Sequence, residues 1–227
     1  MPETLRYAVY ELPELAIRAA ADLFIARAPS TVALSGGSTP KDLYGLLASD
    51  DYRERFDWED LEVFFGDERT VPASHPDSNY GMARRSLLDH VGVDLELVHR
   101  MEADASDLEA AADRYAQLLP ERIDLVLLGM GADGHTASLF PGSDALEEQE
   151  RRCVPAVAAN GTRRLTLTVP TLNAARHVVF LVLGEEKAPA FAAVRKGSDL
   201  PAGRIAPAHG NVTWIMDRAA YGPEASA

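Results

Sequence analysis

Short apolar segments, loops and amphipathic segments follow one another in a regular order along this chain of 227 residues. Short apolar runs bounded by turn residues are typical of buried strands, and apolar residues at helical spacing are typical of helices. Strands are predicted at residues 5–10, 31–34, 62–65, 123–128, 165–169, 178–183 and 212–216. Helices are predicted at residues 12–28, 40–47, 80–90, 107–119 and 186–196.

This order of strand, loop and helix favours an α/β fold with a parallel sheet covered by helices on both faces. Ligands bind such sheets at the carboxyl ends of the strands. The loops after Leu34, Phe65 and Leu128 are therefore the places where a site is expected. No internal repeat or interdomain linker is evident, so residues 1–227 are predicted to form a single domain.

The loop after Leu128 reads "GMGADGHTASLFPG" and begins with the G-x-G-x-x-G spacing of dinucleotide-binding loops. That fingerprint needs a long helix after its third glycine and an acidic residue at the end of the next strand. Pro141 and Gly142 stop any helix within two turns, and the following acids lie in the charged stretch "EEQERR". The sequence therefore argues against a nucleotide cofactor.

Asp133 and His135 lie on either side of Gly134 in this loop. A histidine can accept or donate a proton at neutral pH, and a neighbouring carboxylate can orient its ring. Alternatively, Asp133 caps a short helix and His135 is an ordinary polar residue of its first turn. These residues alone leave both interpretations open.

The loop after Leu34, "SGGSTP", lies between a predicted strand and a predicted helix. Hydroxyl groups, exposed amides and the helix N-terminus together suit a phosphate group. The residues are Ser35, Gly36, Gly37, Ser38 and Thr39. The alternative is a tight turn with an N-cap, and the glycine and lysine spacing excludes a Walker A loop.

The loop after Phe65 places Asp67, Glu68 and Arg69 at the end of a predicted strand, followed by a polar, turn-rich stretch to Asn79. Arg69 could contact a phosphate or a developing oxyanion, and Asp67 or Glu68 could orient it. Other cations follow at the start of later elements: Arg163, Arg164 and Lys187. Each alone reads as a surface charge, and together they could bind a phosphate monoester.

The composition restricts the partners. Nucleic acids and anionic membranes are recognised by basic surfaces, whereas this chain carries a net charge of −13. The single cysteine, Cys153, excludes an intramolecular disulfide and a cysteine-based zinc cluster, and it is expected to be a small buried residue. Neither a signal peptide nor a run of 18 apolar residues is found, so a soluble, cytoplasmic protein is predicted.

Taken in order, several segments resemble the 6-phosphogluconolactonase family. They are "LSGGSTP" (34–40), "GDERTVP" (66–72), "DSNYGMA" (77–83), "LLGMGADGHTASLFPG" (127–142), "RLTLTVPTLNAAR" (164–176), "GEEKA" (184–188) and "VTWIMDRAA" (212–220). The resemblance covers nearly the whole chain. It implies a Rossmann-like α/β/α sandwich with a small appended subregion, as in glucosamine-6-phosphate deaminase and ribose-5-phosphate isomerase.

The resemblance also implies hydrolysis of 6-phospho-D-glucono-1,5-lactone to 6-phosphogluconate, the second step of the oxidative pentose phosphate pathway, with no metal or organic cofactor required. His135 matches the family's proposed general base, with Asp133 beside it, and Asp67 and Arg69 match its acidic-basic loop. The phosphorylated substrate would be bound by the loop at residues 35–39 together with Arg164 and Lys187. The alignment of "RLT" selects Arg164 rather than Arg163.

Two other functions remain as alternatives. An amino-sugar-phosphate deaminase/isomerase carries a similar Asp-Gly-His loop, but an acidic "NEP"-like segment follows it, whereas this loop continues as "SLFPG". A non-catalytic sugar-phosphate sensor would usually need a further module. The predicted partner is thus a small sugar phosphate lactone, and the protein is expected to be a monomer or a small homo-oligomer.

Overall fold

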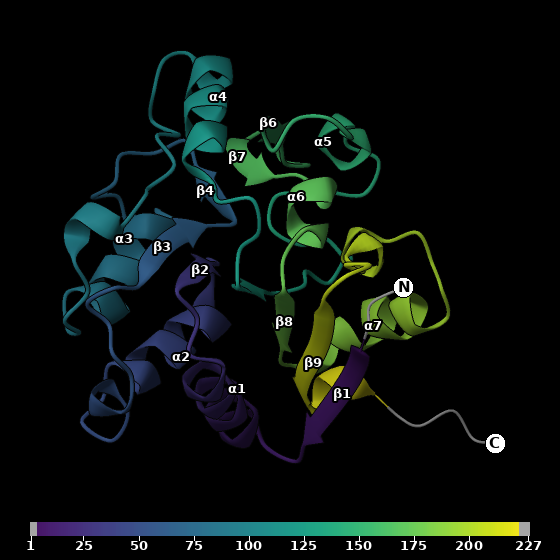
Figure 1. The fold of residues 1–227 in the computed structure, drawn as a ribbon. Helices are drawn as coiled ribbons and strands as arrows, with labels where there is room; N and C mark the ends of the chain where they lie inside the picture. The colour runs from purple at the N-terminus through teal and green to yellow at the C-terminus, as the bar shows by residue number, and fades with distance from the viewer. Residues whose placement is uncertain (1–3, 223–227) are drawn as a thin grey trace.

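The computed structural model describes residues 4–222 and contains two sheets (Figure 1). The larger sheet has six strands in the order β1-β9-β8-β5-β2-β3, and all neighbouring strands in it are parallel. Its strands are β1 (Thr4–Tyr10), β2 (Thr31–Leu34), β3 (Glu62–Phe65), β5 (Leu125–Leu128), β8 (His177–Val182) and β9 (Asn211–Asp217). The predicted α/β fold with a mostly parallel sheet is confirmed.

Helices flank this sheet. They are α1 (Pro13–Arg27), α2 (Ser38–Leu47), α3 (Asn79–Ala83), α4 (Leu108–Leu118), α5 (Asp144–Glu147), α6 (Val169–Asn173), α7 (Ala188–Arg195) and α8 (Arg218–Tyr221). Figure 1 shows α1 and α2 on one side of β8 and β9, and α7 on the other. There Phe191 of α7 packs on Trp214, which stacks on Phe180 at a centroid distance of 3.9 Å. None of the helices within residues 4–222 is long and apolar enough to cross a membrane.

The smaller sheet is the appended subregion. It is antiparallel, in the order β4-β7-β6, and consists of β4 (Asp67–Arg69), β6 (Cys153–Val157) and β7 (Arg163–Leu167). Helix α4 packs against β6. Gly66 joins the two sheets, because its N–H donates to Leu34 O (2.9 Å) and its carbonyl accepts from Leu167 N–H (2.8 Å).

Several predicted elements need correction. Asp67–Arg69, expected in a polar loop, forms strand β4. The strand expected at residues 165–169 runs from Arg163 to Leu167 and lies in the antiparallel sheet. It ends before residue 169 because Val169 and Pro170 already begin α6. The helix expected at residues 80–90 is α3 followed by a π-helical turn, Arg84–Leu88.

Cys153 was expected to be a small buried residue, and this is confirmed, since only 1% of its surface is exposed. Burial raises the pKa of its thiol to about 12. A thiol with such a pKa is protonated at neutral pH and is therefore a poor nucleophile.

The strand order places a switch point between β2 and β5. From β2 the chain continues outward to β3, and from β5 it continues in the opposite direction to β8. Crevices form outside the carboxyl ends of strands at such a point, where connections diverge to either side. The loops after Leu34, Phe65 and Leu128 all leave this edge.

His177 lies at the opposite edge, at the start of β8, and gives the fold a predictable acid sensitivity. Its Nε2 lies 2.9 Å from Thr213 Oγ1, and its Nδ1 is buried with no partner among residues 4–222. Burial, followed by the charges of Arg27 and Arg6, lowers its pKa to about 4. The unfolded chain therefore binds a proton near pH 6.5, and the folded chain does so only near pH 4.

Stability should thus fall as the pH drops from about 6.5 to about 4. Replacing His177 with valine is expected to reduce the loss of unfolding free energy between pH 7 and pH 5 by about 2 kcal/mol. Urea denaturation at both pH values measures this difference, and His209→Val, at an exposed histidine, serves as the control. An unchanged pH dependence in His177→Val would mean that His177 titrates normally in the folded protein.

Candidate functional site

A cavity of about 260 Å³ lies at the predicted edge of the parallel sheet. Its walls are the loops that follow β2, β3, β5 and β8. The lining includes Ser35, Gly36, Gly37, Ser38, Thr39, Asp67, Arg69, Asn79, Gly129, Met130, Gly131, His135, Thr136, Ala137, Glu186 and Lys187. Four loops that are distant in sequence therefore meet in one cavity, as the parallel arrangement predicts.

His135 and Asp133 form a close pair beside this cavity. The distance from His135 Nδ1 to Asp133 Oδ1 is 2.5 Å, and the same oxygen accepts the backbone N–H of His135 at 3.1 Å. Partial burial raises the pKa of Asp133, but these hydrogen bonds and the charge of the ring outweigh burial and lower it. Asp133 is therefore ionised at neutral pH and holds the proton of the neutral imidazole on Nδ1. Nε2 is left as the free base of the ring.

Gly131 makes this pairing sterically possible. A Cβ atom at position 131 would lie 2.1 Å from His135 Nδ1 and 2.6 Å from Asp133 Oδ1. The backbone of Gly131 also holds the loop closed, because its N–H donates to His135 O at 2.8 Å and its carbonyl accepts from Gly134 N–H at 3.0 Å. The glycine spacing that resembles a dinucleotide fingerprint thus leaves space for the Asp-His pair.

The loop after β2 lines the cavity with all five residues predicted to bind phosphate, Ser35, Gly36, Gly37, Ser38 and Thr39. It leads into α2, whose N-cap is Gly37 at φ 107°. The Oγ of Ser35 is buried and has no hydrogen-bond partner among the described residues. A helix N-terminus with an unpaired hydroxyl beside it can accept an anionic oxygen.

Asp67 faces the cavity but does not orient Arg69. Its Oδ2 accepts from Ser138 Oγ at 2.7 Å, and its Oδ1 accepts from Asn79 Nδ2 at 3.1 Å. Arg69 instead donates from Nη1 to Asp77 O at 2.7 Å. Its Nε is buried, with no partner within the described part of the chain. Arg69 itself is part of the cavity lining.

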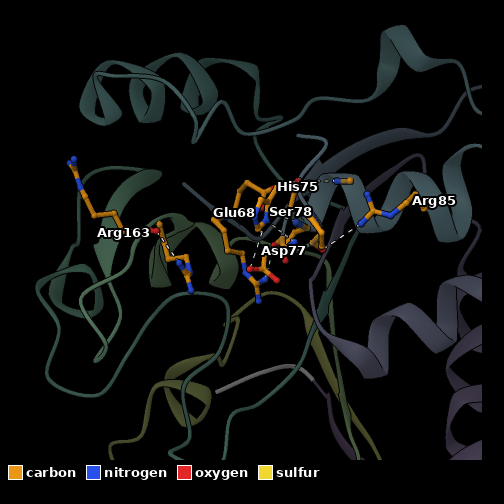
Figure 2. A network of polar contacts seen from close by, with 11 residues as sticks. Glu68, His75, Asp77, Ser78, Arg85 and Arg163 are labelled. Atoms are coloured by element: carbon orange, nitrogen blue, oxygen red, sulfur yellow. Dashed lines mark hydrogen bonds and ion pairs between the residues drawn. The ribbon is translucent and has the colours of Figure 1, made fainter. Parts of the chain in front are cut away.

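Glu68 is not part of the cavity lining, and its carboxylate binds the start of α3 (Figure 2). Its carboxylate accepts the backbone N–H groups of Arg69, Asn79 and Tyr80 at 2.7–2.8 Å. Ser78 Oγ adds a fourth hydrogen bond at 3.0 Å. Burial raises the pKa of this carboxyl despite these opposing hydrogen bonds. Glu68 therefore ties strand β4, which carries Asp67 and Arg69, to the start of α3, which is a structural role.

The predicted cations differ in their placement. Lys187 lines the cavity, and its Nζ lies 3.6 Å from Glu186 Oε1. Arg164 is not part of the lining, although it is the cross-strand neighbour of Arg69. Burial, with the charge of Arg69, lowers the pKa of Arg164. Arg163 is exposed and extends away from the Glu68 network in Figure 2.

Asn79 is the main site residue that carried no predicted role. Asn79 is buried, lines the cavity and lies between the loop at residues 35–39 and strand β4. Its Nδ2 donates to Asp67 O at 2.9 Å, and a Cβ on Gly36 would lie 1.8 Å from its Oδ1. A sequence signal for this position was the segment "DSNYGMA", in which Ser78 is the N-cap of the helix that Asn79 begins.

No cluster of three or more potential metal ligands occurs in residues 4–222.

Comparison with known proteins places this geometry in a family. The family model described as glucosamine-6-phosphate isomerases/6-phosphogluconolactonase matches residues 5–214. A 6-phosphogluconolactonase from Synechocystis sp. is 42% identical over 208 residues, which cover 86% of this chain and 84% of that protein. The solved 6-phosphogluconolactonase from Trypanosoma cruzi is 31% identical, with a TM-score of 0.84 and 97% coverage of both chains.

A monomeric glucosamine-6-phosphate deaminase shares the fold, with a TM-score of 0.81 at 23% identity, covering 96% of this chain and 98% of that one. The fold is therefore common to both activities, and the residues of the cavity must distinguish them. The extent of the family match is decisive for membership: the chain belongs to the glucosamine-6-phosphate isomerase/6-phosphogluconolactonase family.

Proposed function

We propose that this protein hydrolyses 6-phospho-D-glucono-1,5-lactone to 6-phosphogluconate. The observation that supports this function best is that His135, paired with Asp133, lines the same cavity as the Ser35–Thr39 loop and Lys187. One part of the cavity thus offers a base, and another offers donors for a phosphate group. We also propose that the protein is cytoplasmic, as the sequence predicts.

The chemistry needs an activated water molecule and a donor for the developing oxyanion. His135 Nε2 removes a proton from water as its oxygen attacks C1 of the lactone. Asp133 holds the opposite ring nitrogen and stabilises the imidazolium. When the tetrahedral intermediate collapses, the C1–O bond of the ring breaks and the imidazolium returns the proton to the leaving oxygen. No covalent enzyme intermediate is required.

Arg69 is the better-placed donor for the oxyanion. The Gly131 N–H is already used by His135 O, whereas Arg69 lines the cavity and its Nε has no partner among the described residues. A preorganised donor of this kind stabilises the transition state more than the ground state. We therefore assign the oxyanion to Arg69 and the phosphate to the amides of residues 35–39 with Lys187.

Lys187 is expected to act on substrate binding. Replacing it with methionine removes a charge-assisted contact to the phosphate and should raise KM by about 10- to 100-fold, with a smaller change in kcat. Lys196→Met is the control, because Lys196 is exposed at the end of α7. A Lys187→Met enzyme with unchanged KM would place the phosphate elsewhere.

The activity itself is tested by generating the lactone with glucose-6-phosphate dehydrogenase and following its disappearance with and without this protein. The rate of spontaneous lactone hydrolysis must be subtracted. Release of ammonia from glucosamine 6-phosphate, with no acceleration of lactone hydrolysis, would assign the chain to the deaminase branch of the family. Binding of a sugar phosphate without turnover would indicate a sensor.

A further inference from the structure

Ser138 ties the loop that carries His135 to the small antiparallel sheet. Ser138 is 1% exposed, and its N–H and its hydroxyl are both used as donors. Its Oγ donates to Asp67 Oδ2 at 2.7 Å, and its N–H donates to Thr166 Oγ1 at 3.2 Å. Asp67 on β4 and Thr166 on β7 are directly opposite each other in the antiparallel ladder. One serine is therefore held by a cross-strand pair.

The backbone between His135 and Ser138 is strained. Ala137 has a φ of 48°, in the left-handed region that a residue with a Cβ rarely adopts. Hydrogen bonds on both sides hold this conformation: Thr136 Oγ1 donates to Gly129 O at 2.8 Å, and Leu139 N–H donates to Thr136 O at 2.9 Å. Strain of this kind persists only where the surroundings fix the chain.

We propose that Ser138, through Asp67 and Thr166, is a positioning residue for the proposed general base, and that the small sheet acts as a brace for the catalytic loop. The inference rests on the function proposed above. Ser138 does not line the cavity, so it acts through His135. It also gives Asp67 a defined task, which is to accept the Ser138 hydroxyl rather than to orient Arg69.

The proposed effect depends on Ala137, where the hydrogen bonds of Ser138 oppose the strain of the left-handed backbone. Without the Ser138 hydroxyl, the buried Asp67 carboxylate loses one of its two side-chain donors, and the anchor that opposes the strain is weakened. Ala137 can then relax towards a negative φ, which moves His135 away from Asp133. Small displacements of a catalytic group reduce turnover strongly while leaving remote binding contacts in place.

The test compares kinetics with the protonation pattern of the ring. Ser138→Ala is expected to lower kcat by about 10- to 100-fold and to leave KM nearly unchanged, because the phosphate contacts are untouched. In ¹⁵N-histidine NMR of the neutral imidazole, His135 of the parent protein should be protonated on Nδ1. Ser138→Ala should show a mixture of Nδ1–H and Nε2–H tautomers. The resonances of His135 are identified by their loss in His135→Gln.

Ser143→Ala is the matched control, because among residues 4–222 Ser143 Oγ donates only to Phe140 O, in the continuation of the same loop. It should leave both kcat and the tautomer unchanged. If Ser138→Ala does not fold, Thr166→Val tests the same brace from the other strand and should give the same two effects.

Either variant, folded and with the parent kcat and tautomer, would overturn the inference. A reduced kcat with an unchanged tautomer would also overturn it, because Ser138 would then act by another route. The NMR result does not depend on activity. Full turnover by His135→Ala would instead refute the proposed base, so the two failures are distinguishable.

Discussion

Replacing His135 with alanine is expected to lower kcat for lactone hydrolysis by about 10²- to 10⁴-fold, the usual contribution of a general base. KM should change little, because the phosphate donors lie in other loops of the cavity. The loss removes Nε2, the ring nitrogen that Asp133 leaves free by its contact with Nδ1. Initial rates across a range of lactone concentrations, corrected for spontaneous hydrolysis, measure both constants.

His209→Ala is the appropriate control, because His209 is an exposed histidine that is not part of the cavity lining. Asp133→Asn adds a second comparison. The amide can no longer stabilise an imidazolium or fix its tautomer, so kcat should fall although the ring is still present. A His135→Ala enzyme that retained the parent kcat would show that another group activates the water.

The location of the site could be predicted because local sequence and sheet topology agree. Strands β2 and β3 have the predicted bounds, and polar segments follow both of them. In a parallel sheet the carboxyl ends of the strands share an edge. The meeting of loops that are distant in the sequence can therefore be predicted without knowledge of any tertiary contact. This is why Ser35, Arg69 and His135 were correctly expected to lie in one cavity.

The small sheet could not be predicted in the same way. Strand β4 is three charged residues long, and sequence reasoning treats charged residues as exposed. Asp67 and Glu68 are buried because donors from distant segments surround them, and no local pattern encodes those donors. Strand β6 contains Pro155, and a proline argues against a strand in sequence-based prediction. It is tolerated here because β6 is an edge strand.

The role of Asn79 depends on the same kind of distant contact. Its amide meets Asp67 and Gly36, which are 12 and 43 positions away in the sequence. Arg164 lies outside the cavity lining, so the phosphate contact that the sequence resemblance implies for it stays a prediction. Residue type and spacing therefore located the loops, whereas side-chain partners required the three-dimensional arrangement.

Gly131→Ala is expected to reduce kcat by about 10²-fold or more, although it adds only one methyl group and removes no functional group. The new Cβ would lie 2.1 Å from His135 Nδ1, 2.2 Å from its Cε1 and 2.6 Å from Asp133 Oδ1. Real Cβ atoms do not approach other atoms so closely, so the imidazole and the carboxylate must shift from the positions in which they pair. KM should stay close to the parent value.

Gly45→Ala is the matched control, because a Cβ at that exposed position of α2 meets no atom within 4 Å. Alanine is also favoured over glycine in a helix, so this variant should fold at least as well as the parent. The comparison tests geometry rather than the presence of a base. If Gly131→Ala kept full activity while His135→Ala lost it, His135 would act without its Asp133 contact, since the methyl group and that contact occupy the same space.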